Sequence, residues 1–173
     1  MRHRAEQQAF EALWREHRGI ALKVAGVYAR GVEDRRDLVQ EIAAQLWRSF
    51  ASFDARKAKF GTWFYRIALN VAISHLRRSG EGQGRVEPLD EDHLETLAGE
   101  PAAEPDERLA ALHAFIGGLD ALNRALILLY LEDKSYAEIA EVLGISASNV
   151  ATKINRVKHT LRGQMAVAAT TGA

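Results

Sequence analysis

The fold is decided by residues 135–162, which read SYAEIAEVLGISASNVATKINRVKHTLR. Ser135 and Glu138 are spaced as a capping box, in which each side chain bonds the backbone amide of the other residue and a helix begins. Gly144 is suited to the left-handed conformation that ends a helix, and Ser146 is suited to capping the next one. Two helices joined by a tight turn are therefore predicted, the arrangement of a helix-turn-helix.

The second of these helices is predicted to have one apolar and one basic face. Its apolar residues recur at helical spacing and are expected to point inward; they are Val150, Ile154, Val157 and Leu161. No acidic residue occurs between Ser146 and Met165. Arginine pairs with guanine edges, asparagine pairs with adenine, and lysine and hydroxyl side chains reach phosphates, so the opposite face suits the DNA major groove. A solvated helix with a chance positive surface is the alternative. The candidate DNA contacts are Ser148, Thr152, Lys153, Asn155, Arg156 and Lys158.

The first eighty residues also follow a helical pattern. Leu38, Ile42, Leu46 and Phe50 recur every four residues and predict a strong helix, which a polar run at 55–59 follows as a loop. Another helix is expected over about 62–78, with arginines near its C-terminus, where the helix dipole favours cations. No stretch of the chain shows the alternation of a β-strand, so the predicted fold class is all-α.

The net charge of zero conceals a segregation of charges along the chain. The net charge is +7 over residues 1–80, −8 over 81–106 and +1 over 107–173. All three prolines lie in the acidic segment, which has the composition of a flexible linker. We therefore predict helical domains at 1–80 and 107–168, an acidic linker at 81–106 and a disordered tail at 169–173. The basic first domain suggests a polyanionic partner, although a basic solvated surface would look the same.

Several chemistries are excluded or disfavoured by the composition. The chain has no cysteine, which rules out disulfides, thiolate zinc sites and cysteine nucleophiles. No apolar stretch is long enough for a signal peptide or a membrane span, so we expect a soluble cytoplasmic protein without membrane insertion. His17, His75 and His113 are isolated in the sequence, and no metalloprotease or paired-carboxylate motif is present. We expect no catalytic residue, no metal ion and no cofactor.

Three stretches together resemble one known family. Residues 37–41 (DLVQE), with Leu46, Trp47 and Arg48 after them, resemble the polymerase-clamp helix of the sigma-70 family of RNA polymerase sigma factors. Residues 60–72 (FGTWFYRIALNVA) resemble its promoter-melting segment, and residues 130–161 resemble the helix-turn-helix that reads the upstream promoter element. The order and spacing resemble the short extracytoplasmic-function (ECF) branch. This resemblance implies a sigma-2 helical bundle and a sigma-4 helix-turn-helix domain, joined by a flexible acidic linker.

The resemblance also implies roles for particular residues. Aromatic rings beside cations suit single-stranded DNA, because bases stack on the rings and cations hold the phosphates. Trp63 is equally consistent with base stacking and with core packing, whereas Trp14 and Trp47 are expected in the core. The expected contacts to core polymerase are Asp37, Gln40, Glu41 and Arg48. The expected contacts to the minus-10 element, which the protein would melt, are Lys59, Phe60, Trp63, Arg66, Asn70, Arg77 and Arg78. The helix-turn-helix residues would read the minus-35 element as duplex.

The resemblance further implies partners. These are the beta-prime clamp and beta flap of core RNA polymerase, promoter DNA, and an anti-sigma factor that could hold the protein at the inner membrane. The acidic linker is interpreted either as a soluble tether or as a mimic of RNA in the polymerase channels.

The chain also departs from the family pattern. Asp120 stands where many relatives have proline, and Ala151 and Asn155 leave the promoter sequence unpredicted. The alternative function is a helix-turn-helix regulator that binds operators without being a polymerase subunit, which leaves residues 37–78 unexplained.

Overall fold

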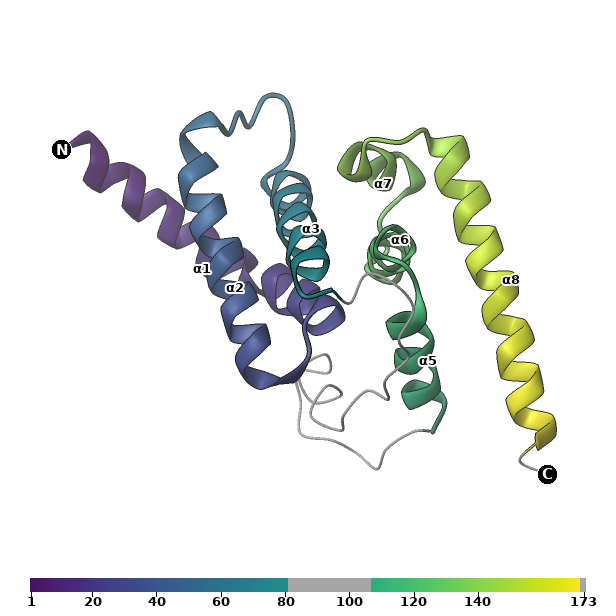
Figure 1. Ribbon diagram of the computed structural model, residues 1–173. Helices are drawn as coiled ribbons and strands as arrows, with labels where there is room; N and C mark the ends of the chain where they lie inside the picture. The colour runs from purple at the N-terminus through teal and green to yellow at the C-terminus, as the bar shows by residue number, and fades with distance from the viewer. Residues whose placement is uncertain (81–106, 172–173) are drawn as a thin grey trace.

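The computed structural model describes residues 1–80 and 107–171, and every regular element among them is a helix. The all-α prediction is thereby confirmed for the described part of the chain. Figure 1 shows the first half of the molecule beside the second, with α8 along the outer edge of the second half. The helices are α1 (Arg2–Tyr28), α2 (Gly31–Ser49), a 3-10 turn (Phe50–Ser52), α3 (Phe60–Arg78), α5 (Glu107–Gly118), α6 (Ala121–Leu131), α7 (Tyr136–Leu143) and α8 (Ala147–Thr171).

The first half is a bundle of α1, α2 and α3, each packed against the other two. The predicted four-residue repeat of α2 is confirmed, because Leu38, Ile42 and Leu46 are completely buried. They face Phe64 of α3, which is also completely buried, within one apolar core. This packing presents the opposite, polar faces of α2 and α3 to solvent.

Aromatic rings fill the end of this bundle near the loop before α3. Trp14 stacks on Phe64 with 5.9 Å between ring centroids, and Trp47 meets the edge of Phe10 at 5.1 Å. Trp14 is half-buried and packs against the core, as predicted. Trp47 is also half-buried and lies among the rings of Phe10, Phe50 and His3. Offset and edge-to-face pairs of this kind are worth about 0.5–1.5 kcal/mol beyond the area they bury.

The second half contains the predicted helix-turn-helix. Ser135 Oγ accepts a hydrogen bond from the Glu138 amide at 3.1 Å, and the Glu138 side chain accepts one from the Ser135 amide at 3.2 Å. Gly144 ends α7 with φ of +69°, a conformation that glycine adopts without steric cost. Ser146 Oγ accepts from the Asn149 amide at 3.1 Å and so caps α8.

The start of α6 shows what the departure at Asp120 does. The Asp120 carboxylate accepts a hydrogen bond from the backbone amide of Asn123 at 2.8 Å, so it caps the helix. An aspartate cap satisfies an amide at the helix start that would otherwise lack a partner. The residue at which the chain departs from the family pattern is therefore the N-cap of α6.

The two halves pack directly on each other and share one apolar core. That core joins Leu69 of α3 to Leu126 and Leu129 of α6, all of which are 1% exposed or less. Helix α3 also packs against α7, and α1 packs against α5 and α6. The prediction of two domains joined by a linker says nothing about this closed arrangement, which the structure adds.

Two predicted segments differ in their outcome. Helix α8 continues to Thr171, so the disordered tail predicted from residue 169 is wrong over 169–171. The predicted acidic linker, 81–106, and the last two residues, 172–173, lie outside the described residues. Within the described part of the chain, no helix combines the length and the apolar character needed to cross a membrane.

Candidate functional site

A row of polar side chains runs along one face of α3. Trp63, Arg66, Asn70 and Arg77 follow one another at intervals of three, four and seven residues, which places them on the same side of the helix. The last three are exposed and Trp63 is half-buried. We name these four residues the α3 row. Lys59, which precedes the helix as its N-cap residue, is also exposed.

Phe60 is not part of this exposed surface. Its side chain lies among the rings of Phe53, Trp63, Phe64 and His17, at centroid distances of 5.0–5.9 Å, and the residue is only 9% exposed. Phe60, a predicted contact of the minus-10 element, is therefore packed inside the bundle in this arrangement. The residue is one turn away from the α3 row and points into the bundle. Trp63 takes part in the ring cluster and remains half-buried, so its packing role is confirmed and part of its surface stays accessible.

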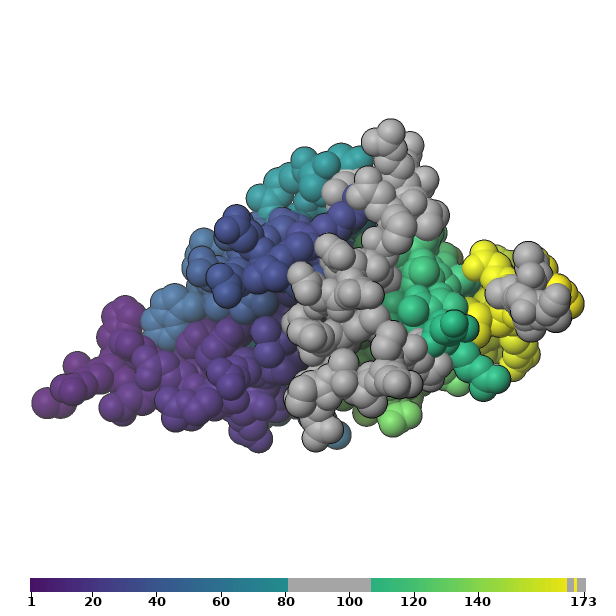
Figure 2. Space-filling model, turned by 90° about the horizontal axis from the view of Figure 1, so that it is seen from below, coloured from purple at the N-terminus to yellow at the C-terminus, as the bar shows by residue number. Residues whose placement is uncertain are grey.

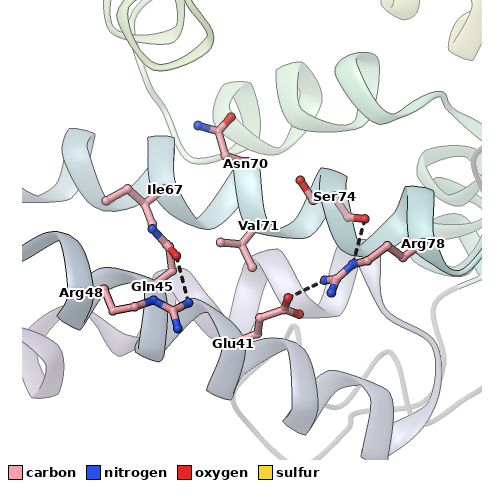
Figure 3. A pocket seen from close by; sticks show the side chains of 8 residues that line it. All are labelled: Glu41, Gln45, Arg48, Ile67, Asn70, Val71, Ser74 and Arg78. Atoms are coloured by element: carbon pink, nitrogen blue, oxygen red, sulfur yellow. Dashed lines mark hydrogen bonds and ion pairs between the residues drawn. The ribbon is translucent and has the colours of Figure 1, made fainter.

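A groove separates α2 from α3 (Figure 3). It has a volume of about 420 Å³, and the apolar side chains of Ile67 and Val71 line it together with polar ones. Asn70 points away from α2 in this view. The polar lining comes from both helices, and its residues are Glu41, Gln45 and Arg48 of α2 with Asn70, Ser74 and Arg78 of α3. Predicted polymerase contacts and predicted promoter contacts therefore meet at one groove.

A network of charged side chains ties α2 to α3 at the end of this groove. The Arg78 guanidinium donates to the Glu41 carboxylate, which also lies 3.5 Å from His75 Nδ1. His75 Nε2 lies 2.9 Å from the Asp34 carboxylate. His75 therefore lies between two carboxylates. It is isolated in the sequence but not in the structure. No group of three or more histidine, aspartate or glutamate side chains suited to a metal ion occurs within the described ranges.

The predicted polymerase-binding residues of α2 do not share one environment. Asp37 and Gln40 are exposed on the outer face of the helix, whereas Arg48 is exposed but lines the groove. Glu41 is half-buried and faces α3 through the network with Arg78. Two of the four residues therefore lie on the outer polar face, and the other two lie at the groove between α2 and α3.

Helix α8 presents most of its predicted DNA contacts to solvent. Val150, Ile154 and Val157 are buried against the rest of the second half, as the sequence predicted. Lys153 is half-buried. The residues that are fully exposed on the opposite face are Ser148, Thr152, Asn155 and Arg156.

Lys158 differs from the other predicted contacts of α8. Its ammonium group lies 4.2 Å from the centroid of the Tyr130 ring, and the residue is half-buried. A cation over an aromatic face is attracted by the ring quadrupole. Lys158 therefore packs on α6 in this structure and is not part of the exposed DNA-facing surface that the sequence predicted.

Polar contacts across the two halves are the functional feature that the sequence did not reveal. Tyr28 donates to the backbone carbonyl of Ala121 at 2.7 Å, and Lys23 pairs with Glu132 at 2.5 Å. Burial raises the pKa of the Tyr28 phenol above its usual value of 10.0. Burial, and then the neighbouring Glu132 carboxylate, do the same to the pKa of Tyr65. Both phenols therefore stay protonated as hydrogen-bond donors at neutral pH.

The second half also makes a hydrogen bond to the α3 row. The Arg66 guanidinium donates to the backbone carbonyl of Glu141 in α7 at 2.6 Å. No local pattern predicts this contact, because its partners are 75 residues apart in the sequence. The closed arrangement therefore occupies one of the predicted promoter contacts with the protein's own backbone.

Comparison with known families gives two matches in sequence order. Residues 13–81 match the model described as Sigma-70 region 2, and residues 109–161 match the model described as Sigma-70, region 4. The first match contains α2 and α3, and the second contains most of α5 and α8 and all of α6 and α7. The two surfaces described above therefore fall in different matched regions.

Similar proteins are found among curated sequences. The ECF RNA polymerase sigma-E factor of Haemophilus influenzae is 32% identical over 158 residues, covering 83% of this chain and 82% of that protein. The ECF RNA polymerase sigma factor SigE of Mycolicibacterium smegmatis is 30% identical over 167 residues, covering 94% of this chain. This chain spans 63% of the length of that second relative.

Similar structures are also known. The structure of CnrH in complex with the cytosolic domain of CnrY is 25% identical with a TM-score of 0.67, covering 93% of this chain and 90% of that one. The sigma factor RpoE in complex with the anti-sigma factor NepR from Bartonella quintana is 19% identical with a TM-score of 0.65, covering 93% and 96%. The second likeness concerns the fold alone.

Proposed function

Because this chain belongs to the ECF branch of the sigma-70 family of RNA polymerase sigma factors, we propose that it binds core RNA polymerase and directs initiation at a cognate promoter. One observation carries the proposal. The region 2 and region 4 matches coincide with two separate surfaces, a polar row beside an aromatic cluster on α3 and a basic exposed face on α8. Single-stranded DNA suits the first surface and duplex DNA suits the second.

The proposed division of labour follows from exposure and chemistry. The outer face of α2 would bind the beta-prime clamp of polymerase, and the second half would bind the beta flap. The minus-10 element would be held by Lys59, the α3 row and Arg78, since melted bases stack on a ring for about 1–3 kcal/mol each. The minus-35 element would be read as duplex by the exposed residues of α8, namely Ser148, Thr152, Asn155 and Arg156, with the half-buried Lys153 beside them.

Promoter binding would require the two halves to separate. The minus-35 and minus-10 elements differ in position by about 25 base pairs, which corresponds to about 85 Å along B-DNA at 3.4 Å per pair. In the closed arrangement α3 packs on α7 and α7 packs on α8. Packed helix axes are about 8–10 Å apart, so the two DNA-facing helices are about 20 Å apart. The closed form would therefore be a resting state, and opening would release the Arg66 guanidinium from the Glu141 carbonyl.

A cytoplasmic place of action and control by an anti-sigma factor are part of the same proposal. Both structural relatives named above were solved as complexes with another protein, and the partner of RpoE is the anti-sigma factor NepR. An inhibitor that binds both halves would hold the closed form. Attachment of such an inhibitor to the inner membrane would place this chain there without a membrane segment of its own.

The test is transcription with the purified chain and core polymerase. We expect co-purification with core, and specific run-off transcripts from some promoters of the source genome in the absence of any other sigma factor. Core enzyme alone is the control. If the chain does not associate with core but binds a two-fold symmetric operator, the proposal is wrong and the protein is an operator-binding regulator.

A further inference from the structure

Glu41 lies between the two predicted surfaces of the first half. The resemblance assigns it to polymerase binding, yet its carboxylate is the ion-pair partner of Arg78, which is assigned to promoter DNA. Figure 3 shows the Arg78 side chain extending back toward α2 to reach it. In this structure, the Glu41 carboxylate of the predicted polymerase-binding surface is therefore paired with the Arg78 guanidinium of the predicted promoter-binding surface.

The surroundings of Glu41 hold its carboxylate in this place. Its second oxygen lies 3.5 Å from His75 Nδ1, and the opposite ring nitrogen of His75 is 2.9 Å from the Asp34 carboxylate. The His75 side chain is 15% exposed, whereas those of Glu41 and Arg78 are 35% and 62% exposed. The pair is therefore positioned from its buried side and accessible from its solvent side, where a partner could compete for either member.

The pair weakens Arg78 as a phosphate ligand. A guanidinium binds phosphate through its positive charge and its planar set of donors. When a carboxylate already accepts from it, part of that donor set is used and a negative charge lies next to any approaching phosphate. Two like charges about 4 Å apart in water repel each other by roughly RT or more. Removing the carboxylate's influence would therefore strengthen binding of a DNA strand at this point.

We propose that Glu41 is a positioning residue that couples polymerase binding to promoter binding. In the free chain it holds Arg78 against α2. When core polymerase binds the outer face of α2, a basic side chain of the polymerase takes over the Glu41 carboxylate, and Arg78 is released to a phosphate of the melted promoter strand. This inference rests on the proposed function, because it gives a mechanism by which the polymerase-bound chain binds DNA better than the free chain.

The decisive experiment measures DNA binding by the free, full-length chain. The probe is a fluorescent 20-nucleotide DNA strand of mixed sequence, because a phosphate contact does not depend on sequence. We expect Glu41→Gln to raise the affinity about two- to five-fold, the range of an exposed ion pair. The slope of log affinity against log salt should steepen by about 0.7, the value for one added phosphate contact on a single strand.

Two variants separate this mechanism from a general loss of negative charge. Glu33→Gln removes the same charge from an exposed position of α2, and we expect it to leave the salt slope unchanged. In an Arg78→Ala background, Glu41→Gln should produce neither the gain in affinity nor the steeper slope. A merely structural role of Glu41 would not change the number of phosphate contacts.

The outcomes distinguish this inference from the proposed function. If the wild-type chain binds core and initiates transcription while Glu41→Gln leaves the affinity and the salt slope of the free chain unchanged, the coupling is overturned and the sigma function stands. A gain that persists without Arg78, or no binding by either chain at low salt, overturns the coupling equally. Failure of the wild-type chain to bind core overturns the proposed function itself.

Discussion

The hydrogen bond from Tyr28 to Ala121 offers a direct test of the closed arrangement. Tyr28 belongs to α1 and is 2% exposed, and its hydroxyl donates across the two halves at 2.7 Å. The change Tyr28→Phe removes that donor and keeps the ring, so the packing of the apolar core is preserved. The perturbation therefore isolates one polar contact between the halves.

The magnitude follows from the value of one buried hydrogen bond. Its net contribution is about 0.5–1.5 kcal/mol, which corresponds to a change of roughly 2- to 13-fold in an equilibrium constant at 25 °C. The closed form should lose this factor relative to a form in which the halves are apart. The stability of each half should change much less, because the Tyr28 ring stays in place.

Single-molecule energy transfer can measure this equilibrium. The chain contains no native cysteine, so dyes can be attached at Ala44→Cys on α2 and His159→Cys on α8, both exposed positions. Low urea concentrations, below those that unfold the helices, make the open form measurable. We expect the open-to-closed ratio of Tyr28→Phe to exceed that of the parent by about fivefold, the centre of the hydrogen-bond range.

The matched control is Tyr136→Phe, which removes a phenol hydroxyl from a half-buried position of α7. We expect this variant to leave the open-to-closed ratio unchanged. The reasoning would be refuted if Tyr28→Phe and the parent had the same open fraction, the same helicity and the same urea midpoint. The hydrogen bond from Tyr28 to Ala121 would then contribute nothing to closure.

Three further predictions concern the tyrosines, the helix cap and the DNA-facing helix. Folding raises the pKa of Tyr28 and Tyr65, so the two phenols lose their protons in the unfolded chain before they do in the folded one. The free energy of unfolding should therefore fall as the pH rises above about 10, by about 1.4 kcal/mol per pH unit for each phenol. Urea titrations at pH 10–11 should show a shallower fall for Tyr28→Phe than for the parent. Ser135→Ala removes the capping box of α7 and should lower the free energy of unfolding by about 0.5–2 kcal/mol, measured by urea denaturation, and an unchanged midpoint would contradict the role of the cap. Arg156→Ala should weaken binding to a cognate minus-35 duplex by about 1–3 kcal/mol, measured by fluorescence anisotropy. Lys158→Met should weaken this binding much less, because Lys158 packs on Tyr130. Equal losses of affinity in the two variants would show that Lys158 also reaches DNA.

Local patterns in the sequence were sufficient to predict the helices and the helix-turn-helix. Capping by Ser135 and the turn at Gly144 depend on neighbours within a few residues, and the stripe from Val150 to Val157 depends only on helical periodicity. The family and its two regions could be predicted for the same reason, because they rest on short stretches in a fixed order.

The position of a side chain around the bundle was decided only by the tertiary structure. Phe60 and Trp63 are both aromatic and three residues apart, yet one is buried among four rings and the other remains half-exposed to solvent. Lys158 resembles its basic neighbours in the sequence, but its ammonium group packs on Tyr130 of another helix and not on the face predicted to contact DNA. Helical periodicity predicts which residues share one face of a helix, but it does not predict which other element that face contacts.

The sequence by itself therefore determined the elements and the family of this protein. Only the tertiary structure decided that the two halves close on each other, that Arg66 is held by α7, and that Glu41 faces Arg78. The physical reason is the separation of the partners along the chain, 75 residues for the first contact and 37 for the second. Such contacts depend on how whole helices pack, which no local spacing encodes.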